Sequence, residues 1–201
     1  MPGRHRYCRS TEAVPVNPLH LPTLAFFSPA QLRSRGQGQS IVYGLAPGPF
    51  GLFFVATLNN EVIRSAFGEG AAESALLQQQ WPQALWQRDD AVATAVVQAL
   101  WGGAPAALSA RVGGTAFQQV VWQALLAVPY GQHCSYQALA VAVGKPQAAQ
   151  AVGNAVGANP LAGIIPCHRV LPQRGGLGGF RWGVSIKQQL LDWEAGQHRP
   201  D

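Results

Sequence analysis

The feature that most limits the fold of this 201-residue chain is a change of pattern along its length. From residue 41, short runs rich in β-branched and aromatic residues alternate with Pro-Gly and Asn-Asn turns, which is typical of strands. Helical segments follow at 71–80 and 89–101, and the second half shows helical patterns. This order predicts an α+β fold, with a small N-terminal sheet and helix domain before a mainly helical C-terminal domain. The expected strands span 41–45, 51–57 and 61–67.

Three closely spaced helix signals mark the second half. Thr115 and Gln118 form a capping-box pattern, and Ser135 is placed to cap the next helix, which Gly144 stops. Pro146 suits the first turn of a third helix. A short helix, a glycine turn and a helix of small residues form a helix-turn-helix candidate, although ordinary helix packing would give the same pattern. The expected helices span 116–127, 136–143 and 146–158.

Residues 1–40 are rich in Pro, Arg, Gln and Ser, and we expect them to be a poorly ordered leader. The apolar stretch within this leader is interrupted by prolines, so it makes a poor signal peptide. We expect an N-terminal α/β domain over 41–110 and a second domain over 113–196.

Composition limits the class of partner. Hydrophobic residues make up 48% of the chain and charged residues 11%, which is typical of a globular protein. The formal net charge of +5 and the pI near 9.6 favour an anionic partner without identifying it. No apolar run reaches the length of a membrane span, so we expect no membrane partner.

The three cysteines, Cys8, Cys134 and Cys167, are an odd number without a framework spacing, which indicates reduced thiols in the cytoplasm. A zinc site formed by Cys8, His5 and His20 is conceivable, but its spacing matches no established ligand pattern. We therefore expect neither a metal nor a cofactor.

The strongest chemical signal is Cys167 directly before His168, behind Ile164, Ile165 and Pro166. The two isoleucines predict a buried segment, and the proline fixes its backbone on entry. A neighbouring imidazole favours the thiolate, which is the nucleophilic form of cysteine. A core cysteine beside an incidental polar residue is the alternative interpretation of this pair alone.

The flanks of Cys167 carry a wider pattern. The ordered blocks resemble the O6-alkylguanine-DNA alkyltransferases, also called methylated-DNA–protein-cysteine methyltransferases. The resemblance is dense over about 113–195 and faint before it. It implies stoichiometric transfer of an alkyl group from O6-alkylguanine in DNA, and possible action on O4-alkylthymine, by a monomer without a cofactor. The blocks lie at 114–118, 121–125, 135–140, 151–154, 159–160, 164–170, 178–183 and 187–194.

The resemblance also implies roles for single residues. Cys167 accepts the alkyl group, His168 acts as a base through a bound water, and Glu194 orients that histidine. Asn159 braces the active-site turn, and the Tyr136 hydroxyl hydrogen-bonds the flipped guanine and helps to protonate it. Without the resemblance, Glu194 could be a surface acid and Asn159 the end of a helix.

DNA contact is expected from the third helix, which enters the minor groove in this family, while the target base flips out of the duplex. Where most members have an arginine that fills the gap in the stack, this chain has Gln150, which is shorter and uncharged. Phe180 stands where many members have tyrosine. Lys187 is a further candidate phosphate contact. The expected DNA-binding residues are Lys145, Ala148, Ala149, Gln150, Ala151, Gly153 and Arg181.

Two other functions fit part of the pattern. A non-catalytic module could mark alkylated guanine for other repair, but its relatives carry another residue in place of the cysteine, and Cys167 is present here. A thiol hydrolase would use Cys167, His168 and Glu194, and nothing in the flanks supports it.

Overall fold

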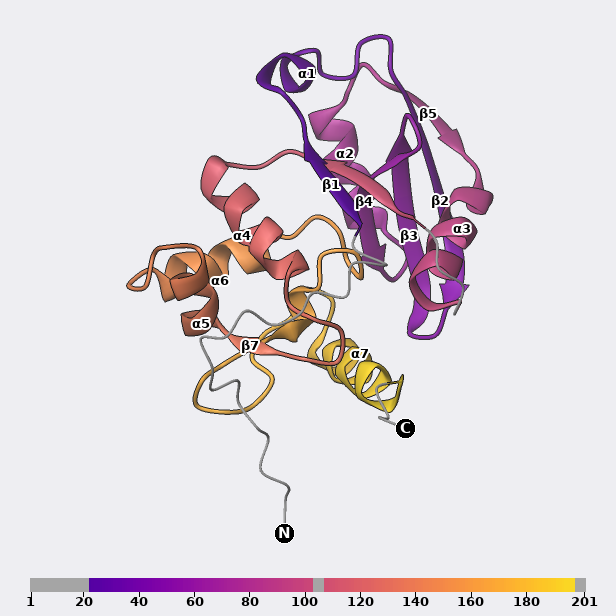
Figure 1. Cartoon of the computed structure of the whole chain (residues 1–201). Coiled ribbons are helices and arrows are strands. Elements are labelled where there is room, and N and C mark those ends of the chain that lie inside the picture. The colour runs from indigo at the N-terminus through magenta and orange to yellow at the C-terminus, as the bar shows by residue number, and fades with distance from the viewer. Residues whose placement is uncertain (1–21, 103–106, 198–201) are drawn as a thin grey trace.

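A computed structural model of the chain describes residues 22–102 and 107–197. Its N-terminal part is a six-stranded sheet in the order β1-β6-β4-β3-β2-β5 (Figure 1). The three central strands pair antiparallel, as expected from their short turns. The strands are β1 (Thr23–Phe26), β2 (Ser40–Gly48), β3 (Gly51–Leu58), β4 (Glu61–Phe67), β5 (Leu85–Arg88) and β6 (Ser109–Val112).

The sheet corrects two expectations. The family resemblance implies a short antiparallel sheet, whereas this sheet is mixed, because β1, β5 and β6 each join it through parallel pairing. The described part of the expected leader, 22–40, is ordered by distant partners. Its strand β1 pairs with β6, and Ser28 caps the short helix α1 (Pro29–Arg33) through a capping box. The residues of the conceivable zinc site, Cys8, His5 and His20, lie in 1–21, outside the described residues.

Both faces of the sheet are covered. Phe53 and Val55 of β3 point into a core shared with α3 (Asp90–Trp101), while Phe54 and Ala56 point into a second core near α2 (Ala71–Gln80). Strand β3 is therefore a continuous apolar run, as expected of a strand that is buried on both faces.

The C-terminal part is helical (Figure 1). The structure confirms the capping box of Thr115 and Gln118 and the cap at Ser135. The third helix starts at Ala149 rather than near Pro146, because a turn at 146–147 precedes it. The helices are α4 (Ala116–Leu126), α5 (Tyr136–Ala142), α6 (Ala149–Gly157) and α7 (Val184–Gln197), and α4, α5 and α6 pack on one another.

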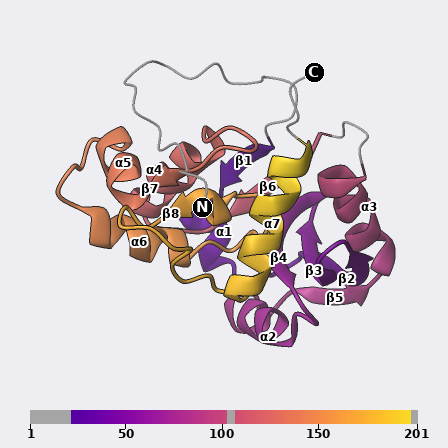
Figure 2. The same ribbon diagram turned by 90° about the horizontal axis from the view of Figure 1, so that it is seen from below.

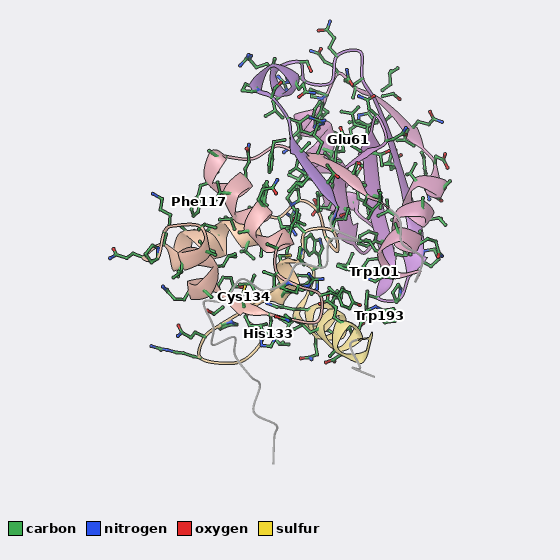
Figure 3. All side chains as sticks on the ribbon, viewed as in Figure 1. Glu61, Trp101, Phe117, His133, Cys134 and Trp193 are labelled. Atoms are coloured by element: carbon green, nitrogen blue, oxygen red, sulfur yellow. The ribbon has the colours of Figure 1, made fainter. Side chains whose placement is uncertain are left out.

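The two parts of the molecule contact each other. Figure 2, seen from below, shows α7 in front of the region where the sheet and the group of α4, α5 and α6 adjoin. Phe50, in the turn between β2 and β3, contacts the rings of Trp101 and Trp193 at centroid distances of 5.5 and 5.8 Å. Figure 3 labels the two tryptophans. Ser65 of β4 forms a bridge to the loop after α6, and its hydroxyl donates to the Ala162 carbonyl at 2.8 Å. The sheet therefore supports the segment that leads to Cys167.

None of the helices in the described part of the chain has the length and apolar character needed to cross a membrane.

Candidate active site

Asn159, at the end of α6, organises the turn that carries the cysteine. Its amide nitrogen lies 3.0 Å from the Ile165 carbonyl, 3.2 Å from the Leu161 carbonyl and 3.1 Å from Cys167 Sγ. Its amide oxygen accepts a hydrogen bond from the Leu161 N–H at 2.8 Å. Since Asn159 is only 1% exposed, these bonds fix the loop and aim one donor at the sulfur.

A short 3-10 helix, Cys167–Arg169, presents the thiol. Directly after it, β8 (Val170–Leu171) pairs in parallel with β7 (Cys134–Ser135), which ends at the N-cap of α5. This two-stranded ladder joins the cysteine turn to the helix-turn-helix. Residues far apart in sequence therefore form one rigid unit around the thiol.

His168, Arg169 and Glu194 form a buried ionic group. His168 Nε2 lies 2.8 Å from Glu194 Oε1, and Arg169 donates to both carboxylate oxygens of Glu194 at 2.9–3.2 Å. Glu194 is therefore not the surface acid that its position on the last helix could have indicated. Arg169 also lies over the Tyr130 ring, 5.4 Å from its centroid. Arg169 was not predicted from the sequence, in which its position next to His168 is the only indication of a role in the site.

The ionisation of this group follows from its contacts. Burial alone would raise the pKa of Glu194, but hydrogen bonds from His168 and Arg169 outweigh it and lower the pKa to about 2. Burial lowers the pKa of His168 below its usual 6.5, although Glu194 opposes this shift. At neutral pH an ionised Glu194 thus accepts a hydrogen bond from the neutral imidazole at Nε2. The other ring nitrogen, Nδ1, then carries the lone pair that can take a proton.

The thiol itself is held in its neutral form. Burial raises the pKa of Cys167 to about 11, while the Asn159 hydrogen bond and the positive charge of Lys187 act in the opposite direction. Lys187 is fully buried and donates to the Val170 carbonyl at 2.7 Å, so the expectation that it contacts DNA phosphate is wrong. Burial lowers the pKa of Lys187 to about 8. The sulfur therefore attacks only when a base removes its proton.

A cavity of about 310 Å³ opens in front of the sulfur. This volume is at the lower end of the range for small-ligand sites, roughly 300–1,000 Å³. Apolar and aromatic side chains dominate the lining, as suits a flat heteroaromatic ring. The lining residues are Tyr136, Gly153, Val156, Gly157, Cys167, Gly179, Phe180, Arg181 and Trp182.

Tyr136, which the family resemblance assigns to the flipped guanine, is the first residue of α5 and lines this cavity. Burial raises its pKa, and the nearby Cys167 raises it further. The phenol therefore keeps its proton at neutral pH and can donate a hydrogen bond into the cavity.

The expected DNA-binding residues of α6 lie on two sides of the helix. Gln150 and Ala151 are exposed, whereas Ala149 packs against the core. Gly153 faces Tyr136, where a β-carbon would lie 3.7 Å from the ring, and it lines the cavity rather than the outer surface. Ala148, half-buried, is the N-cap of α6.

The two expected phosphate contacts differ in their surroundings. Lys145 is exposed in the turn before α6. Arg181 lines the cavity, and its guanidinium donates to Glu73 of α2 at 2.6 Å. The pairing of Arg181 with Glu73 could not be predicted from the sequence, because 108 residues separate the two.

Known proteins resemble this chain in sequence and in structure. Residues 116–196 match the family model of the 6-O-methylguanine DNA methyltransferase DNA-binding domain. The Escherichia coli bifunctional transcriptional activator and DNA repair enzyme Ada is 42% identical over 175 residues, which cover 82% of this chain and 48% of Ada. A Salmonella typhimurium methylated-DNA–protein-cysteine methyltransferase is 51% identical over 87 residues, which cover 43% of this chain and 51% of that protein. The chain thus spans about half the length of these two relatives.

Among solved structures, the O6-methylguanine methyltransferase of Mycobacterium tuberculosis superposes with a TM-score of 0.67 at 32% identity, covering 80% of this chain and 96% of that one. The structure titled as that organism's OGT in complex with DNA gives a TM-score of 0.65, also at 32% identity, over 78% and 94%. The match extends over the sheet as well as the helices, and the cysteine turn lies within the matched family model. The chain therefore belongs to the O6-alkylguanine-DNA alkyltransferase family.

Proposed function

We propose that the chain repairs DNA by irreversible transfer of an alkyl group from O6-alkylguanine to its own Cys167, once per molecule. The observation that carries this proposal is a buried thiol at the wall of an aromatic cavity, beside a histidine that is oriented by an ionised carboxylate. This arrangement provides a nucleophile, a base and a place for a flat ring.

The proposed step is a single displacement. The sulfur attacks the alkyl carbon as the bond from that carbon to O6 breaks, and the thiol proton passes through a water to His168 Nδ1. Tyr136 hydrogen-bonds the departing guanine and helps to protonate it, so that the base does not leave as a bare anion. Asn159 stabilises the developing thiolate through the amide hydrogen that points at Sγ. The new S–C bond is a thioether, which explains why one molecule would act once.

The proposed substrate is duplex DNA whose damaged nucleotide flips into the cavity, at a cost of a few kcal/mol. Exposed residues of α6, with Gln150 and Ala151 at its start, would enter the minor groove. We assign 113–196 to this catalytic and DNA-binding domain, and 41–110 together with β1 and α1 to an α/β domain of the ribonuclease H-like type. We also expect a cytoplasmic monomer. Action on O4-alkylthymine belongs to the same proposal, because that base also carries its alkyl group on an exocyclic oxygen.

Mass spectrometry of the intact protein and its peptides, after incubation with duplex DNA that contains O6-methylguanine, tests the proposal. We expect one methyl group on Cys167 and none on Cys8 or Cys134. Cys167→Ala should lose transfer and keep DNA binding. Transfer that survives in Cys167→Ala contradicts the assignment, and tight binding of the lesion without transfer by the wild type would indicate the non-catalytic module instead.

A further inference from the structure

Residues 178–183, here called the pocket wall, form the side of the cavity opposite α6 and carry Phe180, Arg181 and Trp182. The wall has no regular secondary structure, and three of its six residues are glycine. Gly178 and Gly183 have positive φ angles of 67° and 102°. A segment of this composition has a large conformational entropy, so contacts from elsewhere must hold it in place.

The strongest such contact comes from the N-terminal part of the molecule. Glu73, in the first turn of α2, accepts a hydrogen bond from Arg181 Nη2 at 2.6 Å. The Glu73 side chain is 8% exposed and that of Arg181 is 32% exposed. A carboxylate buried to this extent is stable only when it is paired, so the ion pair holds the wall against α2.

A second arginine forms an ion pair with the other carboxylate oxygen of Glu73. Arg64 of β4 lies 3.5 Å from Glu73 through Nη1 and donates to Gln80 through Nη2 at 3.2 Å. The Arg64 side chain is 9% exposed, and burial is the main cause that lowers its pKa. Glu73 therefore stands between a rigid cation within the sheet and a cation on the pocket wall.

Aromatic packing holds the rest of the pocket wall against the N-terminal sheet. Trp182 contacts Phe67, at the end of β4, with ring centroids 6.1 Å apart, and Phe180 at 5.2 Å. The Arg181 guanidinium lies 5.8 Å from the centroid of the Trp182 ring. A shift of Arg181 would thus move two rings that line the cavity in front of Cys167.

We propose that Glu73 is a positioning residue, whose carboxylate holds Arg181 and so fixes the pocket wall opposite the reactive thiol. The inference rests on the proposed function, because it assigns the wall a part in seating the flipped base. It gives the N-terminal half a role in the reaction, and it means that the charge of Arg181 is used inside the protein rather than on a DNA phosphate.

The test compares Glu73→Gln, Arg181→Gln and their double variant with the wild type. Glu61→Gln is the matched control, because it breaks another carboxylate–arginine pair of the same sheet, with Arg111, away from the cavity. The first-order rate of methyl transfer is measured at saturating duplex DNA. We expect each single variant to be about tenfold slower, the equivalent of ~1.4 kcal/mol, and the double variant to be no slower than either. Arg181→Lys should restore part of the rate.

A second measurement needs no DNA. Iodoacetamide labelling of free protein should become several-fold faster at Cys167 in the Glu73→Gln and Arg181→Gln variants, because a loosened wall exposes the thiol, and stay unchanged at Cys134. Since Arg181 is partly exposed, its variant should fold even if Glu73→Gln does not. Equal acceleration at both cysteines would mean general unfolding and would overturn the proposal.

Three other results would also overturn it. These are additive rate losses in the double variant, an equal loss in Glu61→Gln, and a weaker salt dependence of DNA binding in Arg181→Gln, which marks a lost phosphate contact. If wild-type protein takes up no methyl group, the proposed function fails, and the labelling rates still decide whether Glu73 holds the wall.

Discussion

At the scale of single residues, sequence reasoning located the centre of the site but not its supports. Cys167 and His168 could be predicted because adjacent residues share one turn, and Asn159 and Glu194 through the order of the surrounding motifs. The structure brings all four together, while their catalytic roles stay predictions. Arg169 was missed because the sequence does not show that its guanidinium group pairs with the carboxylate of Glu194. Lys187 was wrongly predicted to contact DNA because lysine is almost always exposed. Nothing in the neighbouring sequence shows that its ammonium group donates to a backbone carbonyl inside the fold.

Asn159 offers a test at this scale. Asn159→Ala removes a donor from two carbonyls and from the sulfur and leaves the buried Leu161 N–H without its partner. We expect a loss of about 1–3 kcal/mol for each group that is left unsatisfied, seen in urea unfolding. Methyl transfer should also slow at temperatures where the variant is still folded. Gln79→Ala, at an exposed position of α2 away from the proposed DNA-binding helix, is the control. An unchanged unfolding midpoint in Asn159→Ala would show that the turn holds without this side chain.

At the scale of elements, regular segments with local signals were predicted well. The helix 71–80 has the expected bounds, and α3 and α4 differ by one residue at an end. Strands β1, β5 and β6 were missed because each is four residues long and gains its stability from partners distant in the chain. Helix α6 starts three residues after Pro146, since the chain first makes a turn that the proline pattern does not reveal.

Helix α6 also carries the clearest departure from the family pattern. Gln150 is exposed near the start of the helix, where an arginine could reach a DNA stack. Gln150→Arg should speed repair of duplex substrate, by up to tenfold if flipping gains ~1.4 kcal/mol and limits the rate. It should change little with single-stranded DNA, where no stack has to be broken. The ratio of the duplex and single-strand rates is measured at saturating DNA, because the added charge strengthens all DNA binding.

Gln137→Arg and Gln119→Arg are unsuitable as controls, because the amides of these residues donate to the Pro146 and Gly114 carbonyls. Gln132→Arg, at an exposed position in the loop after α4, serves to separate charge from position. An unchanged rate ratio in Gln150→Arg would show that this chain flips bases with another side chain, and Tyr136 is the first candidate.

At the scale of the whole molecule, the order of sheet and helices was predictable from pattern, whereas the junction between them was not. The bridge at Ser65 and the contact of Phe50 with Trp193 join segments that are far apart in the chain. Apolar periodicity shows that a surface is buried but not what covers it. The sheet was therefore predicted as a separate domain, although it contacts both the cysteine loop and the pocket wall.

The stability of the whole protein should fall in acid. His168 has a folded pKa below its usual 6.5, so the unfolded chain binds more protons and stability declines as the pH falls below about 6.5. The pKa of Glu194 is about 2 in the folded protein against an ordinary 4.5, so its contribution, on the order of 3 kcal/mol, is present above about pH 4.5 and is lost toward pH 2. Both shifts act in the same direction.

Urea unfolding at about pH 7.5, 5.5, 4 and 2.5 checks this expectation. Glu194→Gln should lower stability at neutral pH and flatten its decline in acid, whereas Asp192→Asn, an exposed acid on the same helix, should leave the decline as it is. The same steep decline in Glu194→Gln would mean that other carboxyl groups determine the acid sensitivity.

The position of Glu194 on α7 has a consequence for the protein's biosynthesis. The N-terminal part of a nascent chain leaves the ribosome first, so Cys167 and His168 emerge before Glu194, whose carboxylate orients the imidazole. Until α7 has left the exit tunnel and docked, the imidazole lacks the carboxylate that orients it. By the proposed mechanism, the chain can therefore transfer an alkyl group only after α7 has been translated and has folded onto the cysteine turn.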